Sequence, residues 1–358
     1  MSDDRHDRVA FEAHLAKTKV VVDRALGELL EKELALVKGV RADVGAAIEG
    51  VKELSLRGGK RFRAGLLAAA YVGYGGSDAD GSTGCIPALV ALELLQVYLL
   101  IHDDWMDGDE IRRGGKSVPA MMREVCGAKQ ADAWSILAGD YACALSQKAL
   151  SFAEPSNIAA AIACFADMQR DVVVGQMLDV ATVPGWDTRS CPDLAPIETV
   201  YRMKTGAYTV RGPLALGAVL AGAGPERVAR LTTFADALGV AFQLTDDLLS
   251  TFGARADTGK PAYGDLREGK MTWLVVKAID DARVREALPG AFGVRDATDE
   301  KLAAFAHAIE ASGAKAASIA RAQELAAEAR AALPALELPT TTTQLLSGAI
   351  AALTERAS

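Results

Sequence analysis

Apolar residues recur along most of the chain at intervals of three and four, the spacing that gathers side chains on one face of an α-helix. Alanine, leucine and glutamate, which favour helices, are abundant in these segments. Alternating runs of β-branched residues bounded by turn residues, which are typical of strands, are scarce. The pattern therefore predicts an all-α fold.

Glycine, proline, aspartate and threonine gather in short stretches that predict the breaks between helices. We expect breaks at residues 73–84, 108–119, 153–157, 184–196, 222–225, 253–269, 289–299 and 334–343. Helices over about 301–333 and 343–356 should close the bundle, with the threonines at 340–343 as a loop or cap. No stretch resembles a domain linker, so a single domain over residues 1–358 is expected.

Composition narrows the class of protein. Half of the 358 residues are hydrophobic, enough for a large core, while a net charge of −8 argues against a nucleic-acid partner. The charged N-terminus lacks the apolar core of a signal peptide, and the longest apolar run, 86–101, contains Glu93 and Gln96, so no membrane span is expected. The five cysteines show no metal-ligand or paired spacing, which fits a cytoplasmic protein.

Two aspartate pairs, Asp103-Asp104 in IHDDWMD and Asp246-Asp247 in FQLTDDLLS, each end an apolar helical run. Asp103 and Asp107 fall one helical turn apart with Asp104 beside them, so we expect three carboxylates to project toward one small volume. Mg²⁺ prefers such oxygen ligands and often completes its shell with substrate phosphate. Two facing clusters of this kind could bind a diphosphate.

Basic residues lie close to both pairs in the sequence. They form three clusters, GGKRFR at 58–63, RRGG at 112–115, and Lys260 with Lys270 after the second pair. Arginine offers a planar fork of donors that suits phosphate oxygens. Acidic and basic clusters that alternate in this way favour a site for diphosphates and metal ions.

Taken together, GGKRFR, DDWMDGDEIRRGG, GQMLD, MKTGAYT, FQLTDD, TGKP and DLREGK resemble the trans-isoprenyl diphosphate synthases, or polyprenyl synthetases, of the short-chain geranylgeranyl and farnesyl type. The resemblance runs from about residue 58 to 270. It implies the isoprenoid synthase bundle of long helices around a deep central cleft, commonly as a homodimer. Each motif alone has a plainer interpretation: GGKR as a flexible turn, Lys204-Thr205-Gly206 as a packing contact, Gln243 as a core amide.

The resemblance also implies a reaction, the Mg²⁺-dependent head-to-tail condensation of isopentenyl diphosphate with an allylic prenyl diphosphate. In such a site Asp103, Asp107 and Asp246 would ligate about three Mg²⁺ ions, with Asp104 and Asp247 beside them. The allylic diphosphate would contact Arg112, Lys204, Thr205, Gln243, Lys260 and Lys270. Isopentenyl diphosphate would contact Lys60, Arg63, Gln96 and Arg113. Of these, Asp103, Asp104, Asp107, Arg112, Lys204, Asp246 and Lys260 are the expected catalytic residues; His102 is expected to be structural.

Three positions depart from the commonest family pattern. Ser250 stands where a third aspartate often completes the second acidic motif, Gln96 replaces a histidine and Ala64 replaces a proline. An amide can still donate a hydrogen bond to phosphate. These changes bear on rate and metal stoichiometry more than on the class of reaction.

Product length would depend on what blocks the tail pocket beneath the first acidic motif. Tyr98 and Leu99 lie nearest, and Tyr98 is the aromatic candidate for the floor. By resemblance we expect geranylgeranyl diphosphate (C20), next farnesyl diphosphate (C15). Alternatively, Tyr98 packs in the core and the floor lies elsewhere.

The sequence leaves two alternative functions open. A class I terpene cyclase also ionises a prenyl diphosphate with an aspartate-rich motif, but it needs no isopentenyl site and so no second phosphate grip like Lys60, Arg63 and Arg113. A catalytically silent regulatory subunit would be expected to lose metal ligands, and position 250 is where this sequence departs.

Overall fold

The computed structural model describes residues 2–77, 83–153, 155–182, 193–253 and 263–354. The chain forms two compact units. The N-terminal unit comprises Glu12–Phe165 and Pro213–Gly224, and the C-terminal unit comprises Met1–Phe11, Ala166–Gly212 and Pro225–Ser358. The expectation of a single domain stays a prediction.

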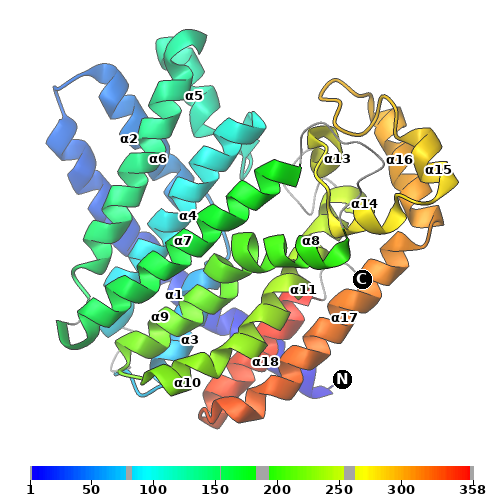
Figure 1. Ribbon diagram of the computed structural model, residues 1–358. Coiled ribbons are helices and arrows are strands. Elements are labelled where there is room, and N and C mark those ends of the chain that lie inside the picture. Colours follow the sequence, from blue (N-terminus) through cyan, green and yellow to red (C-terminus); the bar gives the residue numbers. More distant parts are fainter. Residues whose placement is uncertain (1, 78–82, 154, 183–192, 254–262, 355–358) are drawn as a thin grey trace. The chain divides into compact units, whose positions relative to one another are not determined.

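The N-terminal unit is built around one apolar helix, α4 (Ile86–Asp107), which packs against α2, α3, α5 and α6 (Figure 1). Leu89, Leu92, Leu94 and Leu95 of α4 are fully buried, as the apolar pattern predicted. The other elements are α1 (Ser2–Val37) from Glu12 onward, α2 (Ala42–Leu56), α3 (Phe62–Gly73), η1 (Thr83–Cys85), β1 (Ile111–Arg112), β2 (Gly115–Lys116), α5 (Val118–Cys126), α6 (Ala128–Leu150), η2 (Pro155–Asn157), the first residues of α7 (Ile158–Thr182) and α9 (Gly212–Leu220) from Pro213 onward.

The C-terminal unit is built around α11 (Leu231–Phe252), which packs against η3, α17 and α18. Its buried face includes Phe234, Leu238 and Leu244. The other elements are the rest of α7, α8 (Leu194–Val200), η3 (Tyr201–Arg211), α10 (Pro225–Ala229), α13 (Gly264–Glu268), α14 (Trp273–Ala278), α15 (Ala282–Ala287), α16 (Asp299–Ala311), α17 (Ala314–Ala332), η4 (Leu333–Leu336) and α18 (Thr340–Thr354).

The all-α prediction is confirmed. In the described ranges the strands are β1 and β2, which pair antiparallel through Ile111 with Lys116 and Arg112 with Gly115. The predicted break near 153–157 separates α6 from α7, and that near 289–299 separates α15 from α16. The hairpin falls inside the predicted break at 108–119.

Two details of the C-terminal prediction are wrong. The helix expected over about 301–333 is divided at Ser312 and Gly313, where Gly313 takes a left-handed φ of +86° that ends a helix readily. The Ala-rich sequence on both sides concealed this break. The threonines at 340–343 form the first turn of α18, with Thr342 buried.

Helix α4 is long and apolar enough to cross a membrane by length and composition, and 56% of its most apolar window is buried in the structure. No other helix in the described residues meets that test. A core helix of a soluble protein satisfies the same test, so the absence of a membrane span stays a prediction.

Candidate functional site

The first acidic motif lies in the last turn of α4. Asp103 and Asp107 are both helical, one turn apart and partly exposed. The helix ends at Gly108, whose left-handed φ of +69° lets its N–H bond back to the Asp104 carbonyl. Because a helix C-terminus carries partial negative charge, carboxylates crowded there favour a nearby cation.

Asp104 differs from Asp103 and Asp107 in its burial, and the expectation that the three carboxylates project toward one volume stays a prediction. The Asp104 side chain is fully buried, and Arg112 Nε donates to its Oδ1 at 2.5 Å. Arg112 also pairs with Asp109 at 2.9 Å and lies 3.7 Å from the Asp103 carboxylate. Burial raises the pKa of Asp104 to about 7 although Arg112 opposes the shift. Asp104 Oδ2 has no hydrogen-bond partner among the described residues.

The β1–β2 hairpin carries both arginines of the RRGG segment. Arg57 anchors it from α2's end by donating to the carbonyl oxygens of Arg112 at 3.3 Å and Lys116 at 2.7 Å. Arg113 has a left-handed φ of +52°, and its guanidinium donates to Leu54 O at 3.3 Å. The hairpin thereby holds the Arg113 side chain against the last turn of α2.

Arg113 lies beside the GGKRFR segment. A Cβ built on Gly59 would stand 3.7 Å from the Arg113 guanidinium carbon, an ordinary contact distance. Lys60 is exposed, and Arg63, in the first turn of α3, is partly exposed. The structure therefore brings the first and second basic clusters of the sequence together in the N-terminal unit.

Gln96 lies on α4 and is partly exposed. One turn earlier on α4, buried Glu93 accepts a hydrogen bond from Arg61 Nη1 at 2.6 Å. Arg61 stands between Lys60 and Arg63 in the sequence, so this bond ties the GGKRFR segment to the part of α4 that carries Gln96. Neither Arg61 nor Glu93 was predicted as a site residue.

Tyr98 packs on the side of α4 that faces α6. Its ring meets His102 edge-on at 4.8 Å between centroids, and His102 Nε2 lies 3.0 Å from Ile136 O. A Cβ on Gly139 would overlap the His102 ring, so glycine makes room for it. Leu99 is partly exposed, one turn before Asp103. His102 has the contacts of a packing residue.

The second acidic pair lies on α11 in the C-terminal unit. Asp246 is exposed and Asp247 is buried at 2% exposure. Gly206 of η3 and Gly239 of α11 approach so closely that a Cβ on Gly239 would overlap the other backbone. This contact lets the MKTGAYT segment lie directly against the helix of the second pair.

A chain of hydrogen bonds crosses that contact. Thr205 donates to Gln243 Oε1 at 2.5 Å, and Gln243 Nε2 donates to Asp247 at 2.7 Å. The Tyr201 hydroxyl donates to the other Asp247 oxygen and accepts from the Trp273 N–H at 2.7 Å. Burial raises the pKa of Asp247 well above its ordinary value, and the nearby Asp265 and Asp246 charges add to the shift.

Helix α7 positions Lys204. A Cβ on Gly175 would overlap the Lys204 backbone, and the Lys204 ammonium pairs with Asp179 at 2.5 Å. Both partners come from the GQMLD segment. Lys204 lies in η3, which is a π-helix. This form is rare in proteins overall, but where it occurs it is often at a functional site. Lys270 pairs with Glu268 at 2.6 Å, and Lys260 lies outside the described residues.

The two aspartate pairs share one pattern of burial. In each, the first aspartate is at least partly exposed and the second is buried in a network, with Arg112 for Asp104 and with Tyr201 and Gln243 for Asp247. In the part of the chain described, no group of three or more histidine, cysteine or acidic side chains is close enough to hold a metal ion. The accessible donors are carboxylate oxygens, which suit Mg²⁺.

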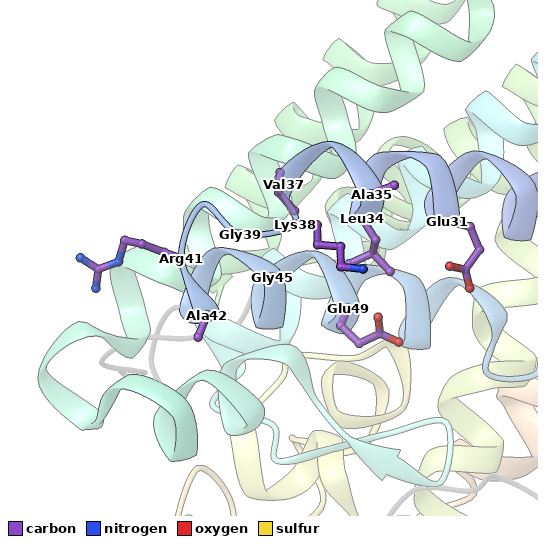
Figure 2. A pocket seen from close by; sticks show the side chains of 10 residues that line it. All are labelled: Glu31, Leu34, Ala35, Val37, Lys38, Gly39, Arg41, Ala42, Gly45 and Glu49. Atoms are coloured by element: carbon purple, nitrogen blue, oxygen red, sulfur yellow. The ribbon is translucent and has the colours of Figure 1, made fainter.

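A groove of about 700 Å³ lies apart from these residues, between the end of α1 and the start of α2. Figure 2 shows Glu31 of α1 and Glu49 of α2 lining it. Lys52 pairs with both carboxylates, at 2.7 and 3.3 Å. No predicted site residue lines this groove.

Comparison with known proteins identifies the class. The family model for polyprenyl synthetase matches residues 47–309. A geranylfarnesyl diphosphate synthase of Aeropyrum pernix is 33% identical over 64% of this chain and 69% of its own. A (2E,6E)-farnesyl diphosphate synthase of Mycobacterium bovis is 33% identical over 72% and 68%. The crystal structure of a Corynebacterium glutamicum geranylgeranyl pyrophosphate synthase, complexed with isoprenyl diphosphate and magnesium, is 30% identical, with TM-score 0.82 over 94% of this chain and 98% of that one.

The protein is therefore a prenyltransferase with the all-α isoprenoid synthase fold. The chain belongs to the polyprenyl synthetase family, with the activity of a short-chain prenyl diphosphate synthase.

Proposed function

We propose that the protein condenses isopentenyl diphosphate head-to-tail with an allylic prenyl diphosphate, in a Mg²⁺-dependent reaction that yields geranylgeranyl diphosphate, or next farnesyl diphosphate. One observation carries the proposal. The N-terminal unit places Arg113 against the GGKRFR segment while the same hairpin pairs Arg112 with the acidic end of α4. The cations near Arg113 would bind isopentenyl diphosphate, and the carboxylates near Arg112 would bind the allylic diphosphate through Mg²⁺.

Isopentenyl diphosphate would bind Lys60, Arg63, Gln96 and Arg113. Lys60, Arg63 and Arg113 carry positive charge, and the Gln96 amide adds a neutral donor. Gln96 lies about two turns of α4 before Asp103, a separation that suits a substrate whose double bond must reach the allylic carbon. A terpene cyclase has no use for this group.

Asp103, Asp107 and Asp246 would hold the Mg²⁺ ions, about three of them. Asp103 and Asp107 are partly exposed and Asp246 is exposed, whereas Asp104 and Asp247 are buried. When bound, the metal would neutralise the charge that develops on the departing diphosphate. Buried Asp104 and Asp247 would orient the neighbouring backbone and the arginine.

The allylic diphosphate would contact Arg112, Lys204, Thr205, Gln243, Lys260 and Lys270. Arg112 offers donors beyond those it gives to Asp104 and Asp109, since a guanidinium has five N–H groups. Lys204 is held in place by Asp179. These cations would orient the leaving group, and the allylic cation would then be attacked by the isopentenyl double bond, with loss of one proton.

Tyr98 and Leu99 would limit product length. Tyr98 is braced by His102 against α6, which gives its ring a fixed position one turn before the acidic motif. A braced aromatic ring resists displacement by a growing isoprenoid tail. This supports a C20 product, and Tyr98 as a plain core residue is the alternative.

We further propose a homodimer in the cytoplasm, with no nucleic-acid partner and no membrane span. The dimer rests on the family resemblance. The acidic balance of 47 Asp and Glu over 39 Lys and Arg supports the absence of a nucleic-acid partner.

The decisive experiment incubates purified protein and Mg²⁺ with isopentenyl diphosphate and each of dimethylallyl, geranyl and farnesyl diphosphate. Products are identified by mass after dephosphorylation. A C20 alcohol from all three starters supports the reaction and the floor. A product that stops at C15 or passes C25 keeps the reaction and rejects the floor. A cyclic hydrocarbon from an allylic substrate alone favours the cyclase, and no turnover favours a silent subunit.

A further inference from the structure

We propose that Arg61 and Glu93 are positioning residues for isopentenyl diphosphate: they set the geometry of Lys60, Arg63 and Gln96 without touching substrate. The inference rests on the proposed isopentenyl diphosphate site. Arg61 is 3% exposed and Glu93 is 2% exposed, and all three guanidinium nitrogens of Arg61 already donate to protein oxygens.

Arg61 joins three helices through one guanidinium. Its Nε donates to Asp23 of α1 at 2.7 Å, its Nη1 donates to Glu93 of α4 at 2.6 Å, and its Nη2 donates to the Ser55 carbonyl of α2 at 2.6 Å. Every branch of the fork is therefore used. A planar fork bound in this way fixes direction as well as distance.

The backbone at Arg61 is unusual. Its φ of +53° is left-handed, which is costly for a residue with a Cβ, and its carbonyl accepts the first hydrogen bond of α3, from Gly65 N at 2.9 Å. Lys60 precedes this turn and Arg63 follows it in the first turn of α3. Because the side-chain network holds Arg61 in the strained conformation, it also sets the directions in which these two cations leave the backbone.

Glu93 carries the same constraint to α4. Glu93 lies one turn before Gln96 on α4. The Arg61–Glu93 bond therefore fixes the position of Gln96 relative to the start of α3. Glu93 Oε1 has no hydrogen-bond partner among the described residues. A buried ion pair with an unsatisfied oxygen is a poor source of stability compared with apolar packing, which favours a role in geometry.

The same unit contains a matched control. Glu33 is also buried, at 6% exposure, and accepts from Lys148 at 2.8 Å and from Tyr141 at 2.7 Å. None of these residues belongs to the proposed site. Glu33→Gln therefore removes a buried carboxylate of the same kind from the same unit.

The test compares full-length wild type, Glu93→Gln and Glu33→Gln. Isopentenyl diphosphate is titrated by calorimetry without added metal, and steady-state assays with Mg²⁺ give kcat and the KM of each substrate. For Glu93→Gln we expect isopentenyl diphosphate affinity to fall, and its KM to rise, on the order of tenfold, with kcat and the allylic KM within about twofold. Glu33→Gln should lower the thermal unfolding midpoint and leave isopentenyl diphosphate affinity unchanged.

Unchanged affinity in folded Glu93→Gln, or an equal loss in Glu33→Gln, overturns the inference. If Glu93→Gln fails to fold, Asp23→Asn replaces it; that variant keeps the Arg61–Glu93 bond, and an affinity loss of about threefold is expected, while no loss overturns the inference. A wild type that binds isopentenyl diphosphate but never condenses it overturns the proposed function and leaves the effect of Glu93→Gln on binding as support. A wild type that does not bind it overturns both.

Discussion

Tyr201→Phe removes one hydroxyl that serves two buried partners. Tyr201 donates to Asp247 and accepts from the Trp273 N–H at 2.7 Å. Phenylalanine fills nearly the same volume, so the change in packing is small. Asp247 keeps its hydrogen bond from Gln243 at 2.7 Å and therefore stays partly anchored. The backbone N–H of Trp273 loses the Tyr201 hydroxyl as its acceptor.

The magnitude follows from those two losses. A hydrogen bond contributes about 0.5–1.5 kcal/mol, and an orphaned buried N–H costs about 1–3 kcal/mol. Because the surroundings can relax, we expect the free energy of unfolding to fall by about 3 kcal/mol in total. Asp246 directly precedes Asp247 on α11, so loosening Asp247 should also lower kcat, by about tenfold.

The assay measures chemical unfolding and, separately, kcat and KM with isopentenyl and geranyl diphosphate. Tyr141→Phe is the matched control, since it also removes a tyrosine-to-carboxylate bond, to Glu33 at 2.7 Å, but in the other unit. The control should lose stability and keep its kcat. A Tyr201→Phe protein that unfolds more readily yet keeps the wild-type kcat would refute the positioning of the second acidic pair by Tyr201.

Three further outcomes are expected. Asp103→Asn should lower kcat at least about a hundredfold at saturating Mg²⁺, and intact turnover would mean the metal assignment is wrong. Tyr98→Ala should shift products beyond C20, and an unchanged product ratio by chromatography would remove Tyr98 as the floor. Burial raises the pKa of Asp236 although Arg211 opposes the shift, so its ionisation costs stability as pH rises from about 4 through the raised value. Asp236→Asn should therefore gain stability relative to wild type between acidic and neutral pH; a pH-independent difference in unfolding midpoint would contradict this.

The sequence predicts those features that depend on local periodicity. Asp103 and Asp107 share a face of α4 because helical geometry dictates it once the apolar run is recognised as a helix. Gly108 predicted the end of α4, and Pro155 predicted the turn before α7. The break at Gly313 was hidden because alanine-rich sequence on both sides favours helix strongly.

Contacts between distant segments could not be predicted in the same way. Arg61 looks like one more cation of a basic cluster, and its burial depends on Asp23 and Glu93 from other helices. Tyr201 lies two residues before the MKTGAYT motif, and its burial against Asp247 depends on α11, which is distant in the sequence. The useful signal would have been the charge of Glu93 within an apolar helix, since a buried carboxylate requires a cationic partner from elsewhere.

The buried aspartates of the two pairs differ in the kind of partner that holds them. Asp104 is held by a permanently charged guanidinium, which is itself shared with Asp103 and Asp109. Asp247 is held by neutral donors, a phenol and an amide. Ser250 further reduces the negative charge near Asp246. The first pair therefore lies in the more charged surroundings, with Arg112 offsetting part of the negative charge. In the second pair Asp246 is the exposed carboxylate. Under the proposed metal assignment, replacing Asp103 should raise the Mg²⁺ concentration needed for half-maximal activity more than replacing Asp246 does. Asp103 and Asp107, one turn apart, would share an ion, whereas Asp246 would share its ion with water and substrate.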